Sequence, residues 1–357
     1  MKHLILTGAC YVDTILNVPY FPREDDKLRA TVAQVRRGGN CPNSIEVLQQ
    51  LLLLRQKDKK SDGAVPRTHL IAVLPARDAS ATAMIAESFG PRSSDDDDDD
   101  YDSPPPNLDL CLYRPGHSTP ASSYIIRSAA TGSRTIVNYY GLPEMEVHEF
   151  QEAAHRFFGS YQAAAAAAAG AAAAAGAGAG AAAAEDSSLW HFEGRIPETT
   201  LACIQHLRSE RNSSAGTTCN KNITISVEVE KPGREGLREL AAAANIVFFS
   251  RSWAEAIRRA LLFCTWGAQG ASALSPRSGS SVVSYRAPDV PAENIVDTVG
   301  AGDTFVAGGL YQVATNKATQ PPNGQWAADD DTIREILVFA VDLATRKVQI
   351  DGFQGLV

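Results

Sequence analysis

The sequence predicts an α/β fold in which helices cover a mostly parallel central sheet, with a smaller β-sheet attached to this core. Short apolar runs typical of buried strands recur along the chain, and helical segments separate them. This is the order of elements that builds a parallel sheet. Residues 10–37 and 111–140 are rich in β-like runs and do not fit this alternation. They therefore predict a second, smaller sheet that projects from the core.

Each element of the core follows from a local pattern. The glycine pair Gly38-Gly39 and a group of polar residues precede a strongly apolar helix. The inner side of this helix is expected to carry Ile45, Val47, Leu48, Leu51 and Leu52. The strands of the main sheet are expected at residues 3–8, 69–74, 188–195, 222–232, 245–250 and 261–267.

The composition is ordinary for a globular protein. The 357 residues are 44% hydrophobic and 21% charged, which suffices for one large core or two modest ones. The formal net charge is -8, but Asp95–Asp100 and Asp102 supply seven acids from one segment. Without them, 33 basic residues stand against 34 acidic ones. No basic stripe is present, so the sequence does not favour a nucleic-acid partner.

The cysteines and the apolar segments predict a cytoplasmic protein. The six cysteines are scattered without a C-x-x-C pair, so we expect reduced thiols and neither a disulfide frame nor a zinc site. The opening apolar strand has no basic segment before it, so no signal peptide is expected. Residues 163–184 contain only Ala and Gly, and without Leu, Ile, Val or Phe they are not expected to cross a membrane.

Two low-complexity segments interrupt what is expected to be a single domain. Residues 91–107 are acidic and proline-rich, and residues 163–187 are dominated by Ala and Gly. Both are expected to be solvated loops at the periphery, without chemical roles. The core is expected to comprise residues 1–9, 38–108 and 141–357, and the smaller sheet residues 10–37 and 109–140.

Polar clusters follow several of the strand-like runs. Ligands of open α/β sheets gather at the carboxyl ends of the strands, so one pocket is expected to collect these clusters. They are Asp13, Gly38-Gly39-Asn40 with Asn43, Glu193-Gly194-Arg195 and residues 297–303.

The segment Gly300-Ala301-Gly302-Asp303 precedes a helical run and is the candidate catalytic segment. Amides at a helix N-terminus bind anions, and glycine lets a phosphate approach them closely. The carboxylate of Asp303 is then placed to accept a proton from a hydroxyl that attacks the phosphate. Alternatively, the two glycines form a turn and Asp303 merely caps the helix. These residues alone leave both interpretations open, and a Walker P-loop is absent from the sequence.

Longer stretches favour the first interpretation. "DTVGAGDTF" at 297–305 resembles the C-terminal signature of the PfkB, or ribokinase-like, carbohydrate kinases. "RRGGNCPNSIEVL" at 36–48 resembles their N-terminal signature. Within this family the chain is most similar to the ketohexokinases, through stretches such as "YFPREDDKLR", "WHFEGR" and the ending "GFQGLV".

The resemblance implies a ribokinase-like three-layer α/β/α core with the smaller sheet as a lid. It implies ATP-dependent phosphorylation of a hydroxyl of a ketose such as fructose. It also implies Mg²⁺ on the ATP phosphates and K⁺ as a further candidate cofactor. A homodimer would form through the smaller sheet, with Asp25 of a second copy reaching the sugar.

The same resemblance implies roles for individual residues. Asp303 would be the base, and Gly300, Ala301 and Gly302 would form the anion hole. The sugar would be bound by Asp13, Gly39, Asn40 and Asn43. ATP would be bound by Arg134, Trp266, Gly267, Gly270 and Thr298. Glu228 and Glu230 would contact Mg²⁺ through water.

Plainer interpretations stay open for several of these residues. Asp13 could satisfy a turn, Asn40 and Asn43 could cap a helix, and Glu193 and Arg195 could form a structural ion pair.

The chain also departs from the family pattern. Residues 251–260 are barely long enough for a parallel crossover beside the nucleotide site. This departure motivates a sugar-binding or regulatory protein without catalysis as the alternative function. A kinase of this family for another sugar or a nucleoside is a third possibility.

Overall fold

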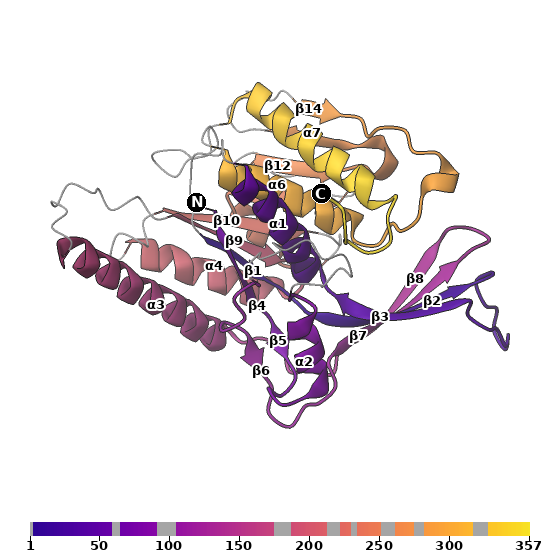
Figure 1. The fold of residues 1–357 in the computed structure, drawn as a ribbon, viewed down its shortest axis with the longest axis horizontal. Coiled ribbons are helices and arrows are strands. Elements are labelled where there is room, and N and C mark those ends of the chain that lie inside the picture. The colour runs from indigo at the N-terminus through magenta and orange to yellow at the C-terminus, as the bar shows by residue number, and fades with distance from the viewer. Residues whose placement is uncertain are drawn as a thin grey trace.

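An eight-stranded sheet forms the centre of the described structure (Figure 1). The computed structural model describes residues 3–58, 65–90, 105–174, 187–212, 222–229, 234–250, 261–274, 282–316 and 328–357. The strand order is β14-β13-β12-β11-β10-β9-β1-β4. In chain order the strands are β1 (His3–Thr7), β4 (Arg67–Ile71), β9 (Ser187–Glu193), β10 (Asn222–Val229), β11 (Ile246–Ser250), β12 (Leu261–Thr265), β13 (Ala271–Leu274) and β14 (Val282–Tyr285).

The sheet is parallel from β4 to β12, and β13 and β14 add an antiparallel edge. In β1, Leu4 and Leu6 belong to one apolar cluster and Ile5 to another, because successive side chains point to opposite faces of the sheet. All three are fully buried, as expected for a strand covered on both sides. The predicted mostly parallel sheet is confirmed.

Helices cover both faces of the sheet and complete a three-layer α/β/α core. The first cluster contains apolar residues of α1 (Asn40–Lys57), α2 (Ser80–Glu87), α6 (Ala301–Thr315) and α7 (Asp330–Lys347). The second contains those of α3 (Val147–Ala174), α4 (Pro197–Asn212) and α5 (Leu237–Ala242). The five apolar residues predicted for the inner side of α1 are all buried.

The smaller sheet projects from the core, as predicted (Figure 1). It has the order β3-β2-β7-β8, formed by β2 (Tyr11–Val18), β3 (Val32–Gly38), β7 (Ala121–Ser128) and β8 (Arg134–Tyr139). Its second segment begins at Ala121 rather than at residue 109. The intervening β6 (Leu112–Tyr113) pairs instead with β5 (Val73–Leu74), next to the core strand β4.

One prediction about the low-complexity segments is wrong. The sequence predicts a loop for the run of Ala and Gly from residue 163, but α3 continues through this run to Ala174. Alanine has the highest helix propensity, and the run extends a helix that is already anchored by the buried Phe150 and Phe157. The acidic residues 91–104, the remaining Ala/Gly residues 175–186 and the short crossover 251–260 lie outside the described residues. Within the described ranges, no helix combines the length and the apolar content needed to span a bilayer.

Two histidines are buried within the sheet. His69 in β4 is 8% exposed, and its Nε2 lies 3.0 Å from Nδ1 of His3. His191 in β9 is 1% exposed, and its Nδ1 lies 3.1 Å from the Ser226 hydroxyl. Burial lowers the pKa of both imidazoles to about 3, helped at His69 by the positive charges of His3 and Arg67.

These histidines predict a loss of stability in acid. Below pH 6.5, their ordinary pKa, the unfolded chain binds protons that the folded chain excludes. The free energy of unfolding therefore falls with decreasing pH, by about 1.4 kcal/mol per pH unit for each histidine. Urea unfolding of His191→Gln at pH 7, 6 and 5 is expected to show a flatter dependence than the parent. The exposed His155→Gln serves as control. An unchanged slope in His191→Gln would contradict this account.

Candidate active site

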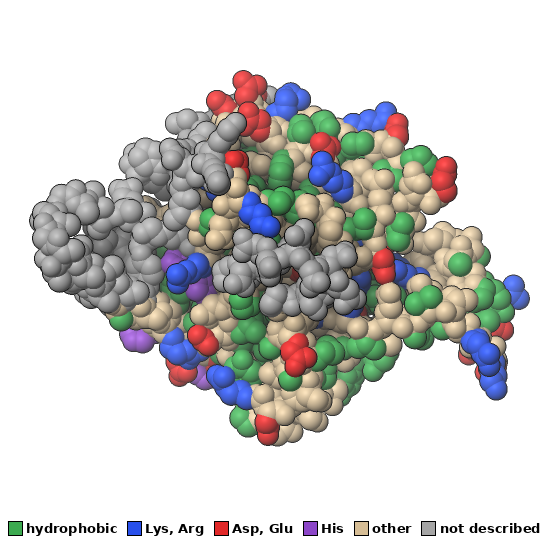
Figure 2. Space-filling view, in the orientation of Figure 1, with side chains coloured by type: hydrophobic (Ala, Val, Ile, Leu, Met, Phe, Trp, Pro, Cys, Tyr) green, Lys and Arg blue, Asp and Glu red, His purple; other side chains and the backbone are tan. Residues whose placement is uncertain are grey.

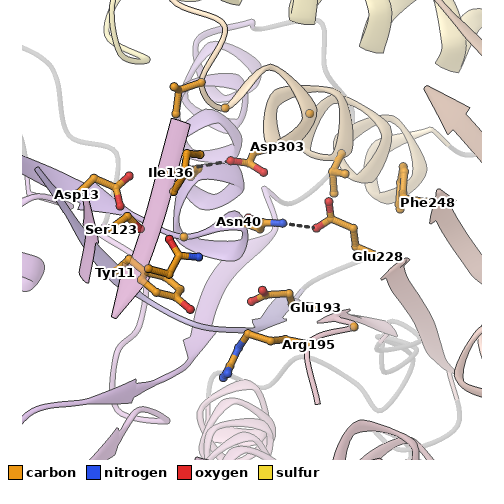
Figure 3. A pocket seen from close by; sticks show the side chains of 18 of the residues that line it. Tyr11, Asp13, Asn40, Ser123, Ile136, Glu193, Arg195, Glu228, Phe248 and Asp303 are labelled. Atoms are coloured by element: carbon orange, nitrogen blue, oxygen red, sulfur yellow. Dashed lines mark hydrogen bonds between the residues drawn. The ribbon is translucent and has the colours of Figure 1, made fainter. Parts of the chain in front are cut away.

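A cavity of about 780 Å³ opens between the two sheets and the N-termini of α1 and α6 (Figure 3). It lies at the carboxyl ends of β9, β10 and β12, where Glu193, Glu228 and Thr265 reach its wall. The predicted polar clusters meet in it. Its lining includes Asp13, Gly39, Asn40, Asn43, Arg134, Glu193, Gly194, Arg195, Glu228, Gly300, Gly302 and Asp303.

The two glycines at the start of α6 are needed for different reasons. Gly300 is the N-cap residue with φ of 82°, and a Cβ there would lie 2.3 Å from Cζ of Phe353. A Cβ at Gly302 would meet no atom within 4 Å, and Gly302 lines the cavity. The first-turn amides of an α-helix have no partner within the helix. Gly300 thus sets the turn, and Gly302 keeps the amides at the cavity wall accessible.

Asp303 joins the start of α6 to the start of α1. Its carboxylate Oδ2 accepts a hydrogen bond of 2.8 Å from Nδ2 of Asn43 (Figure 3). Its carbonyl accepts one of 3.0 Å from the Ser44 hydroxyl. The N-cap position itself belongs to Gly300. The carboxylate therefore bonds across to the second helix at the cavity.

Asn40 and Asn43 do not cap α1. Its N-cap residue is Gly39, which makes no side-chain capping bond. Nδ2 of Asn40 donates to Oε2 of Glu228 at 3.2 Å, across the cavity from α1 to β10. Gly39 has φ of 103°, and a Cβ there would lie 2.2 Å from the carbonyl oxygen of Ala9. The glycine therefore permits the tight entry into α1.

Asp13 lies inside β2 rather than in a turn, and it is 5% exposed. A Cβ at Gly38 would lie 2.1 Å from its carboxylate, so Gly38 makes room for this acid. Burial raises the pKa of the Asp13 carboxyl, and the hydrogen bond from Ser123 and the charges of Arg36 and Arg37 oppose that rise.

A polar row continues from Asp13 across the smaller sheet. Asp13 is paired in register with Ser123 of β7, and Ser123 with Asn138 of β8. All three line the cavity. Sequence analysis missed Ser123 and Asn138, because only the strand register places them beside Asp13.

Arg37 is a third residue at the site, after Ser123 and Asn138, that the sequence does not single out. It is 4% exposed, and its guanidinium pairs with Glu46 and donates to Oδ1 of Asn43 at 3.3 Å. Asn43 is thus held between Arg37 and Asp303. In the sequence, only the position of Arg37 directly before the glycine pair Gly38-Gly39 indicates a role at the site.

Glu193 and Arg195 each have another partner. Arg195 forms an ion pair with Glu144, and its guanidinium lies 4.5 Å from the ring centroid of Tyr140. Oε2 of Glu193 accepts a hydrogen bond of 2.8 Å from the amide of Ala9. Burial opposes a rise in the pKa of Arg195, but the hydrogen bond to Glu144 and the charge of Glu193 raise it, so Glu193 also interacts with Arg195.

Three carboxylates line the cavity in the neighbourhood of Cys41. They belong to Glu193, Glu228 and Asp303, and all three contribute to the raised pKa of the buried Cys41 thiol. Burial is the largest cause of that rise, and the three negative charges add to it. A cation or a cluster of hydrogen-bond donors on a ligand would meet complementary charge here.

The residues expected at the nucleotide take different places. Arg134 lines the cavity, and its Nη1 donates to the Thr298 hydroxyl at 2.6 Å. Trp266, Gly267 and Gly270 form the connection from β12 to β13, directly after the cavity residue Thr265. Gly270 has φ of 96°, and a Cβ there would lie 2.1 Å from the carbonyl oxygen of Tyr285.

Among the described residues, Ala301 and Asp25 do not line the cavity, and neither do Thr298, Trp266, Gly267 and Gly270. Ala301 is in the first turn of α6. Asp25 is exposed in the connection between β2 and β3 and has a positive φ of 65°. Glu230 lies outside the described residues.

Comparisons with known proteins identify the family and the fold of the chain. Residues 113–352 match the model described as "pfkB family carbohydrate kinase". The chain belongs to this family. It is 26% identical to ketohexokinase of Mus musculus over 375 residues, which cover 100% of this chain and 99% of the relative.

Solved structures show the same fold. Ribokinase from Giardia lamblia has a TM-score of 0.65 at 14% identity, with 100% of this chain and 95% of that chain covered. A nucleoside kinase from Methanocaldococcus jannaschii has a TM-score of 0.59 at 14% identity, with the same coverage. The fold is therefore ribokinase-like, and the chain is an ATP-dependent carbohydrate kinase.

Gly300 and Gly302, at the start of α6, give a stability prediction. Gly300→Ala is expected to lower the free energy of unfolding by roughly 2–4 kcal/mol, because it adds backbone strain and an overlap with Phe353. Gly302→Ala is the matched control and is expected to change it by less than about 1 kcal/mol, because the added methyl meets open space. Urea unfolding measures both. Equal effects would show that the turn does not require glycine at 300.

Proposed function

We propose that this kinase phosphorylates a ketose of the fructose type, with Asp303 as the general base. The observation that carries the proposal is the contact between Asn43 and Asp303 at 2.8 Å. It puts the acid between first-turn amides suited to phosphate and a set of polar groups suited to a sugar. The match to a ketohexokinase over nearly the full length of both chains supports the ketose as substrate.

The sugar end of the cavity would be formed by α1 and the smaller sheet. Asp13, Asn40 and Asn43 offer carboxylate and carboxamide groups, which donate to and accept from adjacent hydroxyls. Ser123 and Asn138 extend this polar surface. A buried carboxylate such as Asp13 gains from sugar hydroxyls the hydrogen bonds that water would otherwise supply.

The phosphate end would be formed by the first turn of α6. A sugar hydroxyl gives its proton to Asp303 as its oxygen attacks the γ-phosphorus of ATP. The new bond joins sugar oxygen to phosphorus, the bond from the γ-phosphorus to the bridging oxygen breaks, and ADP leaves. The amides beside Gly302 and the Arg134 guanidinium would stabilise the charge on the transferring phosphoryl group.

The carboxylates at the cavity also fit Mg²⁺. This ion prefers oxygen ligands and is usually held by one or two carboxylates together with substrate phosphates. Glu228 lines the cavity, and the hydrogen bond from Asn40 fixes its carboxylate. In this proposal Glu228 would contact the ion through water. Bound Mg²⁺ would neutralise charge on the ATP phosphates. Glu230 stays a prediction for the same role.

We further propose a homodimer formed through the smaller sheet. The face that carries Asp13, Ser123 and Asn138 is turned to the cavity, so neighbouring residues on the strands point the other way. That opposite face exposes large apolar side chains, and hydrophobic side chains are visible on the projecting sheet in Figure 2. They are Val35, Tyr124, Val137 and Tyr139, exposed by 63, 53, 59 and 56%. Asp25 would then serve the cavity of a second copy.

The function is tested by ADP release with a panel of sugars and nucleosides. Fructose and related ketoses are expected to give the highest kcat/KM. A preference for ribose or a nucleoside would overturn the substrate, and the absence of turnover with every compound would overturn the kinase function.

The role of Asp303 is tested by Asp303→Asn, which keeps the shape of the side chain. We expect turnover to fall by roughly 100- to 10,000-fold, because the base is lost. Calorimetry should still detect sugar binding. Asp289→Asn is the matched control, because that acid is exposed on the surface. Near-normal turnover of Asp303→Asn would show that another group takes the proton.

The dimer is tested by light scattering. Particles of twice the chain mass of 38.1 kDa are expected. Val137→Asp should shift them to monomers, because it places a charge in the proposed apolar interface. Val282→Asp, at a site that is 62% exposed on β14, should leave the dimer intact. A monomeric parent protein would contradict this proposal.

A further inference from the structure

A buried ammonium group lies behind the loop that leads into the start of α6. The side chain of Lys347, the last residue of α7, has no exposed surface. Its Nζ donates to the carbonyl and to Oδ2 of Asp297 at 3.1 and 3.2 Å, and to the carbonyl of Ile350 at 3.4 Å. The ring centroid of Phe353 lies 5.2 Å away. Burying a charge is unfavourable unless it is paired, so the lysine depends on the Asp297 carboxylate and the two carbonyls at this position.

Asp297 fixes the backbone that runs into the anion hole. Its Oδ1 accepts from the amide of Val299 at 2.8 Å, directly before Gly300. Its carboxylate has no exposed surface and also forms ion pairs with Arg36 and Arg127 of the smaller sheet. Although burial would raise the pKa of Asp297, the charges of Lys347 and the two arginines and the Val299 amide lower it. The Asp297 carboxylate is therefore ionised, and its hydrogen bond with the Val299 amide fixes the loop before Gly300.

The ligands of the Lys347 ammonium are of the kind that binds a monovalent cation. Main-chain carbonyls coordinate K⁺ in proteins by replacing its water shell, and a carboxylate supplies the balancing charge. Here two carbonyls and a carboxylate surround the ammonium, and an aromatic face adds a cation–π contact. The oxygens that a K⁺ ion at this loop would require are already bonded to Lys347. The residues present therefore do not fit K⁺ as an added cofactor at this place.

We propose that Lys347 is a positioning residue that supplies, as a side chain, the cation needed by the anion-hole loop, so that the kinase works without K⁺. The inference rests on the proposed function only in taking the start of α6 as the phosphate site. Lys347 acts through Asp297 and the turn at Gly300 and does not touch the sugar or ATP. Its loss should therefore lower kcat and leave the KM for the sugar nearly unchanged.

The test needs the parent protein and two variants. Lys347→Ala removes the ammonium and leaves a space lined by the oxygens of Asp297 and Ile350. We expect its kcat to fall by about 10- to 100-fold, because the anion hole is misplaced. Added NH₄⁺ or K⁺ should restore kcat in a saturable manner. Lys347→Met, which fills the same space without charge, should lose activity and regain none.

A second measurement separates this inference from the proposed reaction. Without any substrate, NH₄⁺ should raise the unfolding midpoint of Lys347→Ala and leave those of the parent and Lys347→Met unchanged. The parent should have the same kcat when K⁺ is replaced by Na⁺ or by tetramethylammonium, which is too large for the site. Absence of activity in the parent would refute the proposed function and leave the stability test to decide on Lys347.

Three results would overturn the inference. They are a parent enzyme that loses activity without K⁺, a Lys347→Ala variant with full kcat, and a loss in that variant that no small cation restores. The parent experiment requires no substitution, so the inference can be refuted even if Lys347→Ala does not fold.

Discussion

The bond between Asn43 and Asp303 is the contact on which the rest of the site depends. It joins residues 260 positions apart in the chain and brings the N-termini of α1 and α6 to one cavity. Each helix enters it through a glycine with positive φ, Gly39 or Gly300, and neither position has room for a side chain. The Ser44 hydroxyl adds a second bond to the Asp303 carbonyl. Two helix ends with positive partial charge and a carboxylate between them form the arrangement suited to phosphoryl transfer.

A second layer of contacts supports this arrangement from behind. Phe353 packs against Gly300, and the Asp297 carboxylate gathers Lys347 together with Arg36 and Arg127. These two arginines belong to β3 and β7, strands of the sheet that carries Asp13 and Ser123. One buried carboxylate therefore ties the phosphate loop both to the C-terminal segment and to the sheet on the sugar side. The cost of burying so many charges is offset by their mutual pairing.

The sequence predicted the features that have a local cause. The strands follow from apolar runs, the buried face of α1 from its periodicity, and the sharing of one cavity from the position of polar residues after strands. Contacts set by register or by tertiary packing were not predictable. Gly38 makes room for Asp13 only because β2 and β3 pack in this register. Arg195 forms its ion pair with Glu144 only because tertiary packing brings the two side chains together. Lys347 ends a helix, where a basic residue is ordinarily solvated and complements the helix dipole. The extension of α3 into the Ala/Gly run follows from the helix propensity of alanine, which low-complexity composition alone does not indicate.

A crystal structure of the protein with a ketose, Mg²⁺ and a non-hydrolysable ATP analogue tests the central claim most directly. The account predicts that one sugar hydroxyl lies within hydrogen-bond distance of the Asp303 carboxylate. It also predicts that the terminal phosphate rests on the first-turn amides of α6, beside Gly302. A terminal phosphate bound elsewhere in the cavity, or a reacting hydroxyl that faces a different acid, would contradict it.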